Sequence, residues 1–166
     1  DDDITLDTEI VLRTLTFYEY AEEHYCLSGG MMDFEQLHVL YEAGARHSVG
    51  KDDPGPNPLK IFVNRHQVYV QQTDALNSLL VEYGIDYGGF WFFAMPKDYV
   101  REIGLLLPFF LLGDDIEYSL RIRKHFGERI LFVPPISVWH MAFYRGAKAR
   151  SRYLWVRNLL IVNLIY

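Results

Sequence analysis

Two groups of carboxylates, far apart in the sequence, have residue types suited to metal binding and to acid–base chemistry. The chain opens with Asp1, Asp2 and Asp3. Residues separated by one position at a strand end point to the same side, so Asp1 and Asp3 could share a hard divalent cation that also touches a diphosphate. In Gly113-Asp114-Asp115-Ile116-Glu117 one aspartate could deprotonate a hydroxyl nucleophile. The plainer alternatives are a terminal charge cluster and the acidic first turn of a helix.

A histidine follows a tryptophan at the end of an apolar segment, as Trp139-His140. If this imidazole joined carboxylate oxygens around one ion, the mixed donor set would favour manganese over calcium. The alternative is a partly buried histidine with ordinary hydrogen-bond partners.

Aromatic side chains gather after a pair of glycines. Gly88 and Gly89 would let the backbone approach a flat ligand closely, and the face of a sugar can stack on rings such as Phe90 and Trp91. An aromatic set of this size is also typical of a hydrophobic core. Its members are Tyr87, Phe90, Trp91, Phe92, Phe93, Trp139, Phe143 and Tyr144.

A basic stretch near the end of the chain contrasts with the acidic whole. These side chains could contact the phosphates of a nucleotide sugar or anionic lipid headgroups. The solvated face of a helix explains them equally well. They are Arg145, Lys148, Arg150, Arg152 and Arg157.

Composition bounds the class of protein. The 166 residues include 16 Lys and Arg against 22 Asp and Glu, a formal net charge of −6, and 50% of them are hydrophobic. So much apolar side chain excludes disorder of the whole chain and favours one α/β or α+β domain. The acidic balance argues against wrapping of duplex nucleic acid, because phosphate binding needs a basic face. The single cysteine, Cys26, cannot form an internal disulfide, which favours a reducing cytoplasm.

The elements that must position these groups follow from hydrophobic spacing and turn residues. Gly29-Gly30 is expected to mark either a turn or a close approach of two backbones. Three prolines and a glycine exclude regular structure from residues 51–60. The predicted elements of the first half are a helix over 8–23, a strand over 24–32 and a helix in the first half of 34–45 that turns at Gly44; residues 61–70 are ambiguous.

In the second half a helix is predicted over 114–126, since this segment has acids in its first turn and bases in its last. A turn is expected at Pro134-Pro135 between two short strands. The other predicted elements are helices over 73–83 and 96–103, a buried strand over 86–95, strands over 129–133 and 136–141, and a helix over 153–166.

Both ends of the sequence look cut. Three carboxylates stand at the start with no apolar strand before them, and the apolar segment 153–166 stops without a cap or a polar tail. We expect an excised fragment whose last helix packs on something outside it.

Taken in order, these groups resemble inverting family 2 glycosyltransferases of the GT-A fold, especially the bacterial galactofuranosyltransferase-like branch. The matching segments cover nearly the whole chain. They are Asp1–Ile4, Ser28–Met32, Tyr87–Phe93, Leu107-Pro108, Gly113–Tyr118 with Leu120-Arg121, Val138–His140 and Arg157-Asn158.

The resemblance implies a hexosyltransferase that moves a sugar, galactofuranose as the first candidate, from a UDP-sugar to a hydroxyl of a growing glycan, with inversion at the anomeric carbon. It implies Mn²⁺ or Mg²⁺ as cofactor. It also implies a glycan or lipid-linked glycan acceptor and no nucleic-acid partner.

Site residues follow from the resemblance position by position. Asp1 and Asp3 match the metal-binding aspartates, and His140 matches the histidine that completes the metal site. Asp115 matches the catalytic base, and its neighbour Asp114 would help to position acceptor hydroxyls.

The remaining matches lie on the substrate side. Glu117 would position acceptor hydroxyls together with Asp114. Phe90 and Trp91, beside Gly89, fall where the family has an acceptor-facing aromatic pair, with phenylalanine here where tryptophan is frequent. Arg157, within the basic stretch, is the remaining substrate-binding candidate.

The implied fold is α/β, with residues 1–152 as the acceptor- and metal-binding part of a GT-A catalytic domain and 153–166 as the start of a truncated C-terminal helix. The family's nucleotide-binding strands precede the aspartate motif and are missing, so the fragment alone is expected to be inactive. The expected location is the cytoplasm, at the inner face of the cell membrane, with peripheral membrane contact in the longer protein.

Two other classes stay open. A non-catalytic glycan-binding or scaffold domain of the same fold would carry the aspartates only as surface charge. A metal-dependent hydrolase or nucleotidyl enzyme would use Asp1, Asp3 and Asp115 around cations. Metal affinity separates the first class, and release of free sugar without an acceptor separates the second.

Overall fold

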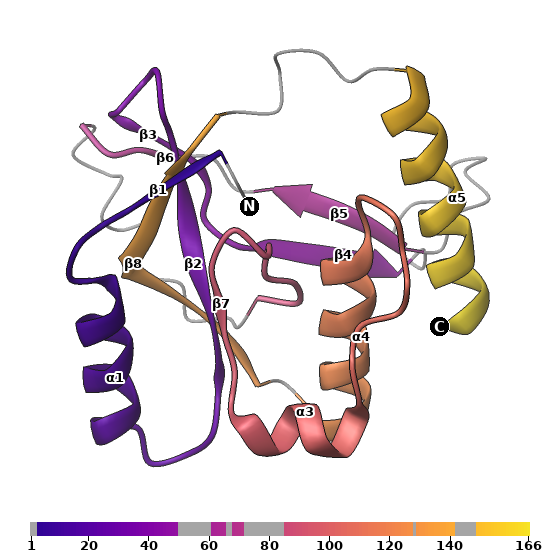
Figure 1. Cartoon of the computed structure of the whole chain (residues 1–166), viewed down its shortest axis with the longest axis horizontal. Helices are drawn as coiled ribbons and strands as arrows, with labels where there is room; N and C mark the ends of the chain where they lie inside the picture. Colours follow the sequence, from indigo (N-terminus) through magenta and orange to yellow (C-terminus); the bar gives the residue numbers. More distant parts are fainter. Residues whose placement is uncertain (1–2, 50–60, 66–67, 72–84, 128, 142–148) are drawn as a thin grey trace.

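The computed structural model describes residues 3–49, 61–65, 68–71, 85–127, 129–141 and 149–166. These residues form an α/β structure, as the sequence predicts, with a mixed sheet in the order β1-β8-β2-β3-β6 and β7 paired to β2 (Figure 1). A separate hairpin pairs β4 with β5. The strands are β1 (Ile4–Leu6), β2 (Cys26–Asp33), β3 (Val39–Glu42), β4 (Ala45–Val49), β5 (Ile61–Arg65), β6 (Val68–Tyr69), β7 (Phe93–Ala94) and β8 (Ile130–His140).

The central pair of the sheet is β2 and β8, which run parallel. β2 is buried along nearly its whole length, as expected of a strand covered on both faces. Gly29 and Gly30 lie within this strand. A Cβ atom on Gly29 would come within 3.0 Å of Phe92 Cβ and 3.1 Å of the Ile136 carbonyl oxygen. Of the two predicted alternatives, the close approach of backbones is therefore the one observed.

The two prolines of β8 do not form the predicted turn. β8 is one strand of 11 residues, and its register with β2 shifts between the pairs Ser28–Phe132 and Gly30–Ser137. Pro134 and Pro135 lie in the bulge made by this shift and are exposed. Their missing N–H groups are not needed there, because a bulge interrupts the ladder of hydrogen bonds.

The helix predicted in the first half of 34–45 is wrong, since residues 34–38 form bends and a turn. Residues Val39–Glu42 form β3, which pairs antiparallel with β2 through Met31–Glu42 and Met32–Leu40. Pairing along a buried neighbour outweighs local helical spacing here. The predicted turn at Gly44 is confirmed by its positive φ of 85°.

The strand predicted over 86–95 is also largely wrong, since only Phe93–Ala94 pair with β2. The preceding residues form an irregular segment in which the ring of Trp91 folds back over Gly89, where a Cβ atom would lie 2.1 Å from that ring. An extended strand would place these residues apart, so the glycine permits the compact fold-back.

Four helices are present in the described part of the chain: α1 (Ile10–Tyr20), α3 (Lys97–Ile103), α4 (Asp114–Phe126) and α5 (Ala149–Ile165). The predicted bounds of α4 are confirmed, α3 begins one residue later than predicted, α1 is shorter than predicted, and α5 begins four residues earlier. Figure 1 shows the sheet with α1 beside it, then the segment that leads into β7, then α4 and α5, with α3 across the foot of α4. The predicted helix over 73–83 and the loop over 51–60 lie outside the described residues.

Helix α5 carries apolar side chains on two opposite faces. Leu154, Leu159 and Val162 are buried. Tyr153, Val156, Leu160 and Leu164, at helical spacing, are exposed. Among the described helices none is both long and apolar enough to cross a membrane. That this exposed face packs on something outside the fragment stays a prediction.

The close approach at Gly29 generates a stability prediction. We expect Gly29→Val to lower the free energy of unfolding by about 1–3 kcal/mol, because backbone and Cβ neighbours cannot rotate away from the added methyl groups. Urea denaturation followed by circular dichroism measures it. The control is Thr5→Val at an exposed position of β1, for which we expect a change within about 0.5 kcal/mol; equal effects would contradict the explanation.

Candidate active site

The acid pair at the start of α4 is held in a defined orientation. Gly113 precedes the helix with φ 89°, and the Asp115 carboxylate accepts two hydrogen bonds. The Tyr87 hydroxyl donates to Asp115 Oδ2 at 2.7 Å, and the Ile116 backbone N–H donates to Asp115 Oδ1 at 2.8 Å. Asp114 and Asp115 are both half-buried. The helix dipole favours negative charge at this end, so Asp115 is an oriented, partly accessible carboxylate.

The backbone that leads into this helix is strained. Leu111 and Leu112 have φ of 59° and 66°, in the left-handed region that residues with a Cβ atom avoid. Each such residue costs on the order of 1–3 kcal/mol and persists only where surrounding contacts enforce it. The strained residues lie just before the acid pair. Backbone strain of this kind is often found at functional sites.

Glu117 differs from its two acidic neighbours because it is buried and paired. Its side chain is 2% exposed and forms an ion pair with Arg121, whose Nε donates to Glu117 Oε1 at 2.9 Å. The Tyr166 hydroxyl donates to the same oxygen at 2.9 Å. Burial, and then the bond to Glu117, raises the pKa of Tyr166 to about 12, so this hydroxyl remains a donor at neutral pH. Both carboxylate oxygens of Glu117 therefore have partners within the protein.

The predicted metal ligands Asp3 and His140 lie next to each other. β1 pairs antiparallel with β8, with Ile4 opposite His140, and this brings Asp3 Oδ1 to 3.3 Å from His140 Nε2. His140 Nδ1 lies 2.6 Å from the Met141 carbonyl oxygen. A carbonyl oxygen only accepts, so Nδ1 carries the hydrogen and Nε2 faces the carboxylate.

These two donors fit a hard or borderline divalent cation. Metal-binding histidines commonly donate their second ring N–H to a backbone carbonyl, as His140 does to Met141. A lone pair and a carboxylate oxygen that face each other would repel without a proton or a cation between them. Within the described residues no group of three or more His, Cys, Asp or Glu side chains forms a metal site. Asp1, the other predicted ligand, lies outside those residues.

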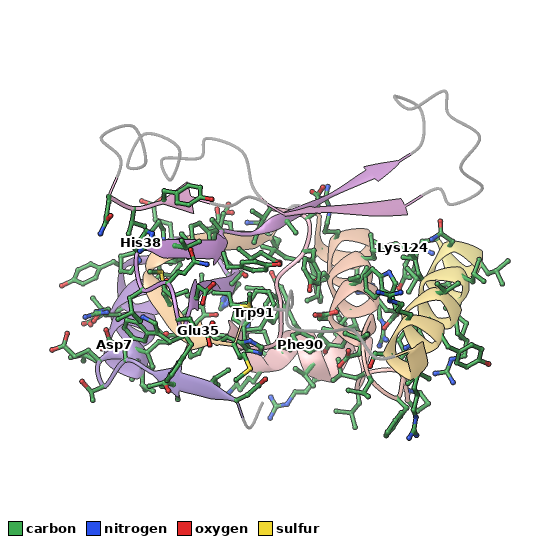
Figure 2. The ribbon with its side chains drawn as sticks, turned by 90° about the horizontal axis from the view of Figure 1, so that it is seen from above. Asp7, Glu35, His38, Phe90, Trp91 and Lys124 are labelled. Carbon is green, nitrogen blue, oxygen red and sulfur yellow. The ribbon has the colours of Figure 1, made fainter. Side chains whose placement is uncertain are left out.

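The predicted aromatic pair lies at two levels of burial. The Trp91 side chain is 6% exposed, and its Nε1 donates to the Gly29 carbonyl oxygen at 2.8 Å. Phe90 is half-buried, and its ring contacts those of Phe93 and Tyr118 at centroid distances of 5.4 and 6.2 Å. Figure 2 shows both side chains in the middle of the molecule, between the sheet and α4.

One short segment, residues 87–91, joins the two candidate groups. At its start Tyr87 contacts Asp115, and at its end the ring of Trp91 lies 6.5 Å from that of His140. The Cα atoms of Tyr87 and Trp91 are four residues apart in the chain and so at most about 14 Å apart in space. The structure therefore brings the acid pair and the Asp3–His140 pair to the two ends of a single segment.

Arg157, the remaining predicted site residue, uses part of its donor capacity within the protein. Its Nε and Nη2 donate to Asn158 Oδ1 at 2.9 and 2.7 Å. The sequence analysis did not single out the hydroxyl contacts of Tyr87 and Tyr166. Both depend on residues distant in the chain, and no local signal in the sequence indicates them.

Comparison with known proteins relates this chain to glycosyltransferases. No family model matches it. Along its whole length it is similar to two curated proteins named galactofuranosyltransferase GlfT2, with 28% identity over 180 aligned positions to that of Mycobacterium tuberculosis and 27% over 172 to that of Mycolicibacterium smegmatis. Each alignment covers 100% of this chain and 26% of the relative, so the chain spans about a quarter of their length. The similarity supports a glycosyltransferase.

The buried pair of Glu117 and Arg121 generates a prediction about stability. We expect Arg121→Met to lower the free energy of unfolding by about 3–5 kcal/mol at neutral pH, because it leaves a buried carboxylate without its cation. Thermal and urea unfolding measure it.

The matched control is Arg101→Met, which removes the cation of an exposed pair with Asp98. Exposed pairs contribute about 0–1 kcal/mol. A loss at Arg121 no larger than that at Arg101 would show that Glu117 is not dependent on its partner.

Proposed function

We propose that the protein is the metal- and acceptor-binding part of an inverting glycosyltransferase of the GT-A fold that transfers galactofuranose from a UDP-sugar to a glycan hydroxyl. The observation that carries the proposal is the placement of two separate carboxylate groups, Asp115 and Asp3, at the two ends of segment 87–91. A single displacement needs two such groups: one accepts a proton, and the other helps to hold the leaving diphosphate. The names of the similar proteins supply the sugar.

Asp115 is the proposed general base. The acceptor hydroxyl gives its proton to the Asp115 carboxylate as its oxygen bonds to the anomeric carbon, and the bond from that carbon to the diphosphate oxygen breaks with its electron pair on the diphosphate. Tyr87 and the Ile116 N–H hold the carboxylate in one orientation. A base fixed in this way loses little freedom in the transition state, which supports its efficiency.

The neighbouring side chains divide the remaining tasks. Asp114, half-buried beside the base, is the proposed partner of acceptor hydroxyls, with Phe90 as the ring against which the acceptor sugar stacks. For Glu117 we propose a structural part in place of acceptor binding, since Arg121 and Tyr166 occupy both of its oxygens. Trp91 and Gly89 form the floor below the acceptor, and Arg157 remains a candidate for the phosphates.

Asp3 and His140 are the proposed protein ligands of Mn²⁺ or Mg²⁺, together with Asp1. When bound, such a cation would neutralise the negative charge that grows on the leaving diphosphate. The Met141 carbonyl holds the His140 ring in the tautomer that leaves Nε2 as a donor of electrons.

We place the longer protein in the cytoplasm, at the inner face of the membrane, where a lipid-linked acceptor would lie. Two exposed arginines at the start of α5, Arg150 and Arg152, support this location because cationic side chains attract anionic headgroups. Exposed Tyr153 follows them, and tyrosine favours membrane interfaces.

The base assignment is tested by Asp115→Asn in a protein that also carries the expected nucleotide-binding strands. We expect sugar transfer to fall by about 10²–10⁴ because the proton has no acceptor, while binding of donor and Mn²⁺ stays near that of the parent protein. Transfer is measured with labelled UDP-galactofuranose and donor binding by calorimetry.

The control is Asp98→Asn, the same change in the exposed first turn of α3, which should leave transfer unchanged. A loss of donor binding in Asp115→Asn would make Asp115 a ligand, and release of free sugar at equal rate without acceptor would make the protein a hydrolase.

The metal assignment is tested by titration of Mn²⁺ with UDP into the same protein. We expect binding of the two to be coupled and His140→Ala to weaken Mn²⁺ binding by at least about tenfold, because a ligand is removed. His125→Ala changes an exposed histidine beside Glu102 and should have no effect. Absence of Mn²⁺ binding in the parent protein would favour a glycan-binding domain without catalysis.

A further inference from the structure

Asn158 of α5 reaches across to the loop that precedes α4. It is fully buried, and its Nδ2 donates to the carbonyl oxygens of Leu111 and Leu112 at 2.7 and 2.5 Å. Figure 1 shows α5 beside α4, with the loop that enters α4 running between these two helices. A single side-chain amide therefore binds two successive backbone carbonyls.

The orientation of this amide is fixed by its neighbour. Arg157 Nε and Nη2 both donate to Asn158 Oδ1. Because a guanidinium only donates and a carbonyl only accepts, the oxygen of the amide must face Arg157 and its nitrogen must face the loop. Rotation of the amide by 180° would oppose donors to donors and acceptors to acceptors.

The two carbonyls belong to the strained residues. Leu111 and Leu112 are left-handed at φ 59° and 66°. Their side chains are 55% and 37% exposed, so apolar burial contributes little to holding them there. The Cβ atom of Asn158 also lies close to the next residue, since a Cβ atom on Gly113 would be 3.3 Å from it.

The start of the same loop is held from α4. Arg121 Nη1 donates to the carbonyl oxygens of Ile103 and Leu105 at 3.0 and 2.9 Å, and the Tyr118 hydroxyl donates to the Gly104 carbonyl oxygen at 3.0 Å. The loop is thus tied at both ends by side chains, and its second tie lies within three residues of Asp114.

We infer that Asn158 is a positioning residue for Asp115: its amide holds Leu111 and Leu112 in the left-handed conformation and so fixes the direction in which α4 begins and the Asp115 carboxylate points. The Glu117 N–H donates to the Gly113 carbonyl oxygen at 3.0 Å, which couples the end of the loop to the first turn of the helix. The inference rests on the proposed function, in which Asp115 is the base. Arg157 acts through Asn158 by orienting its amide.

The variant that tests this is Asn158→Asp, which keeps the size of the side chain and an acceptor for Arg157 but loses both N–H donors to the loop. We expect kcat for transfer to fall by about tenfold or more, since a small displacement of a catalytic group has a large effect, and KM for the donor to stay within about twofold. Hydrogen exchange of the amides of residues 111–117 should become faster. If a buried aspartate prevents folding, Asn158→Ser, which is smaller and uncharged, is measured in its place, with the same changes expected in kcat and hydrogen exchange.

A second change separates positioning from general packing of α5. Leu111→Gly together with Leu112→Gly removes the steric penalty of the left-handed conformation, so adding both to Asn158→Asp should recover part of the lost kcat. A packing defect in α5 would not respond to glycines in the loop. The matched control is Asn163→Asp on the same helix, whose amide donates to the Leu159 carbonyl within α5 and which should leave kcat and loop exchange unchanged.

The outcomes decide the inference whether or not the proposed function holds. If the parent protein transfers no sugar, the proposed function fails. Hydrogen exchange alone then tests whether Asn158 holds the loop. Two results would overturn the inference. One is hydrogen exchange over residues 111–117 of Asn158→Asp that equals that of the parent protein, and the other is a loss of kcat that the two glycines do not reduce.

Discussion

The close approach of β2 to two other backbone segments is the constraint on which the candidate site depends. At Gly29 the space for a Cβ atom is taken by Phe92 on one side and by the Ile136 carbonyl of β8 on the other. The Gly29 carbonyl in turn accepts the indole N–H of Trp91. A Cβ atom at this position would require Phe92 or β8 to shift by a few tenths of an ångström, because packed interiors have no free volume to receive it. Phe92 belongs to the same stretch of chain as Trp91, which contacts His140, and Tyr87, which contacts Asp115.

The first turn of α4 shows how three acidic residues in one short motif come to differ. Glu117 is buried and neutralised by Arg121, and it holds Tyr166 of α5. Asp115 is half-buried and held by a phenol and a backbone N–H. Because the charge of Glu117 is offset, it contributes little repulsion to the pair of aspartates beside it. Burial and partners, and not residue type, separate a structural carboxylate from an accessible one.

The strained residues before α4 are held by a side chain from another helix, α5. Leu111 and Leu112 bring the chain into α4 in a conformation that leucine avoids, and the bonds that hold them come from α5, 46 and 47 residues further along the chain. Such an arrangement makes the orientation of a helix N-terminus depend on a distant helix. It also gives α5 a function beyond the burial of its apolar face.

Several elements could be predicted because their signals are local. The positions of α3 and α4 follow from Pro96, from Gly113 and from the order of acids and bases along 114–126, and the strand β2 follows from the apolar run that contains it. The failed predictions share one cause. In each case the conformation depends on pairing with β2, which can lie far away in the sequence. The segments concerned are that around β3, the fold-back before β7 and the bulge at Pro134-Pro135.

The sequence by itself determined which residue types were available and the order in which they occur: two groups of carboxylates, a histidine, an aromatic segment and the helix that begins at the second group. The tertiary structure alone decided their partners. Four contacts show this: Tyr87 with Asp115, Asp3 with His140, Arg121 with Glu117, and Asn158 with the loop before α4. The physical reason is that a hydrogen bond or an ion pair depends on distance and direction over a few ångströms, whereas hydrophobic periodicity fixes only which face of an element turns inward.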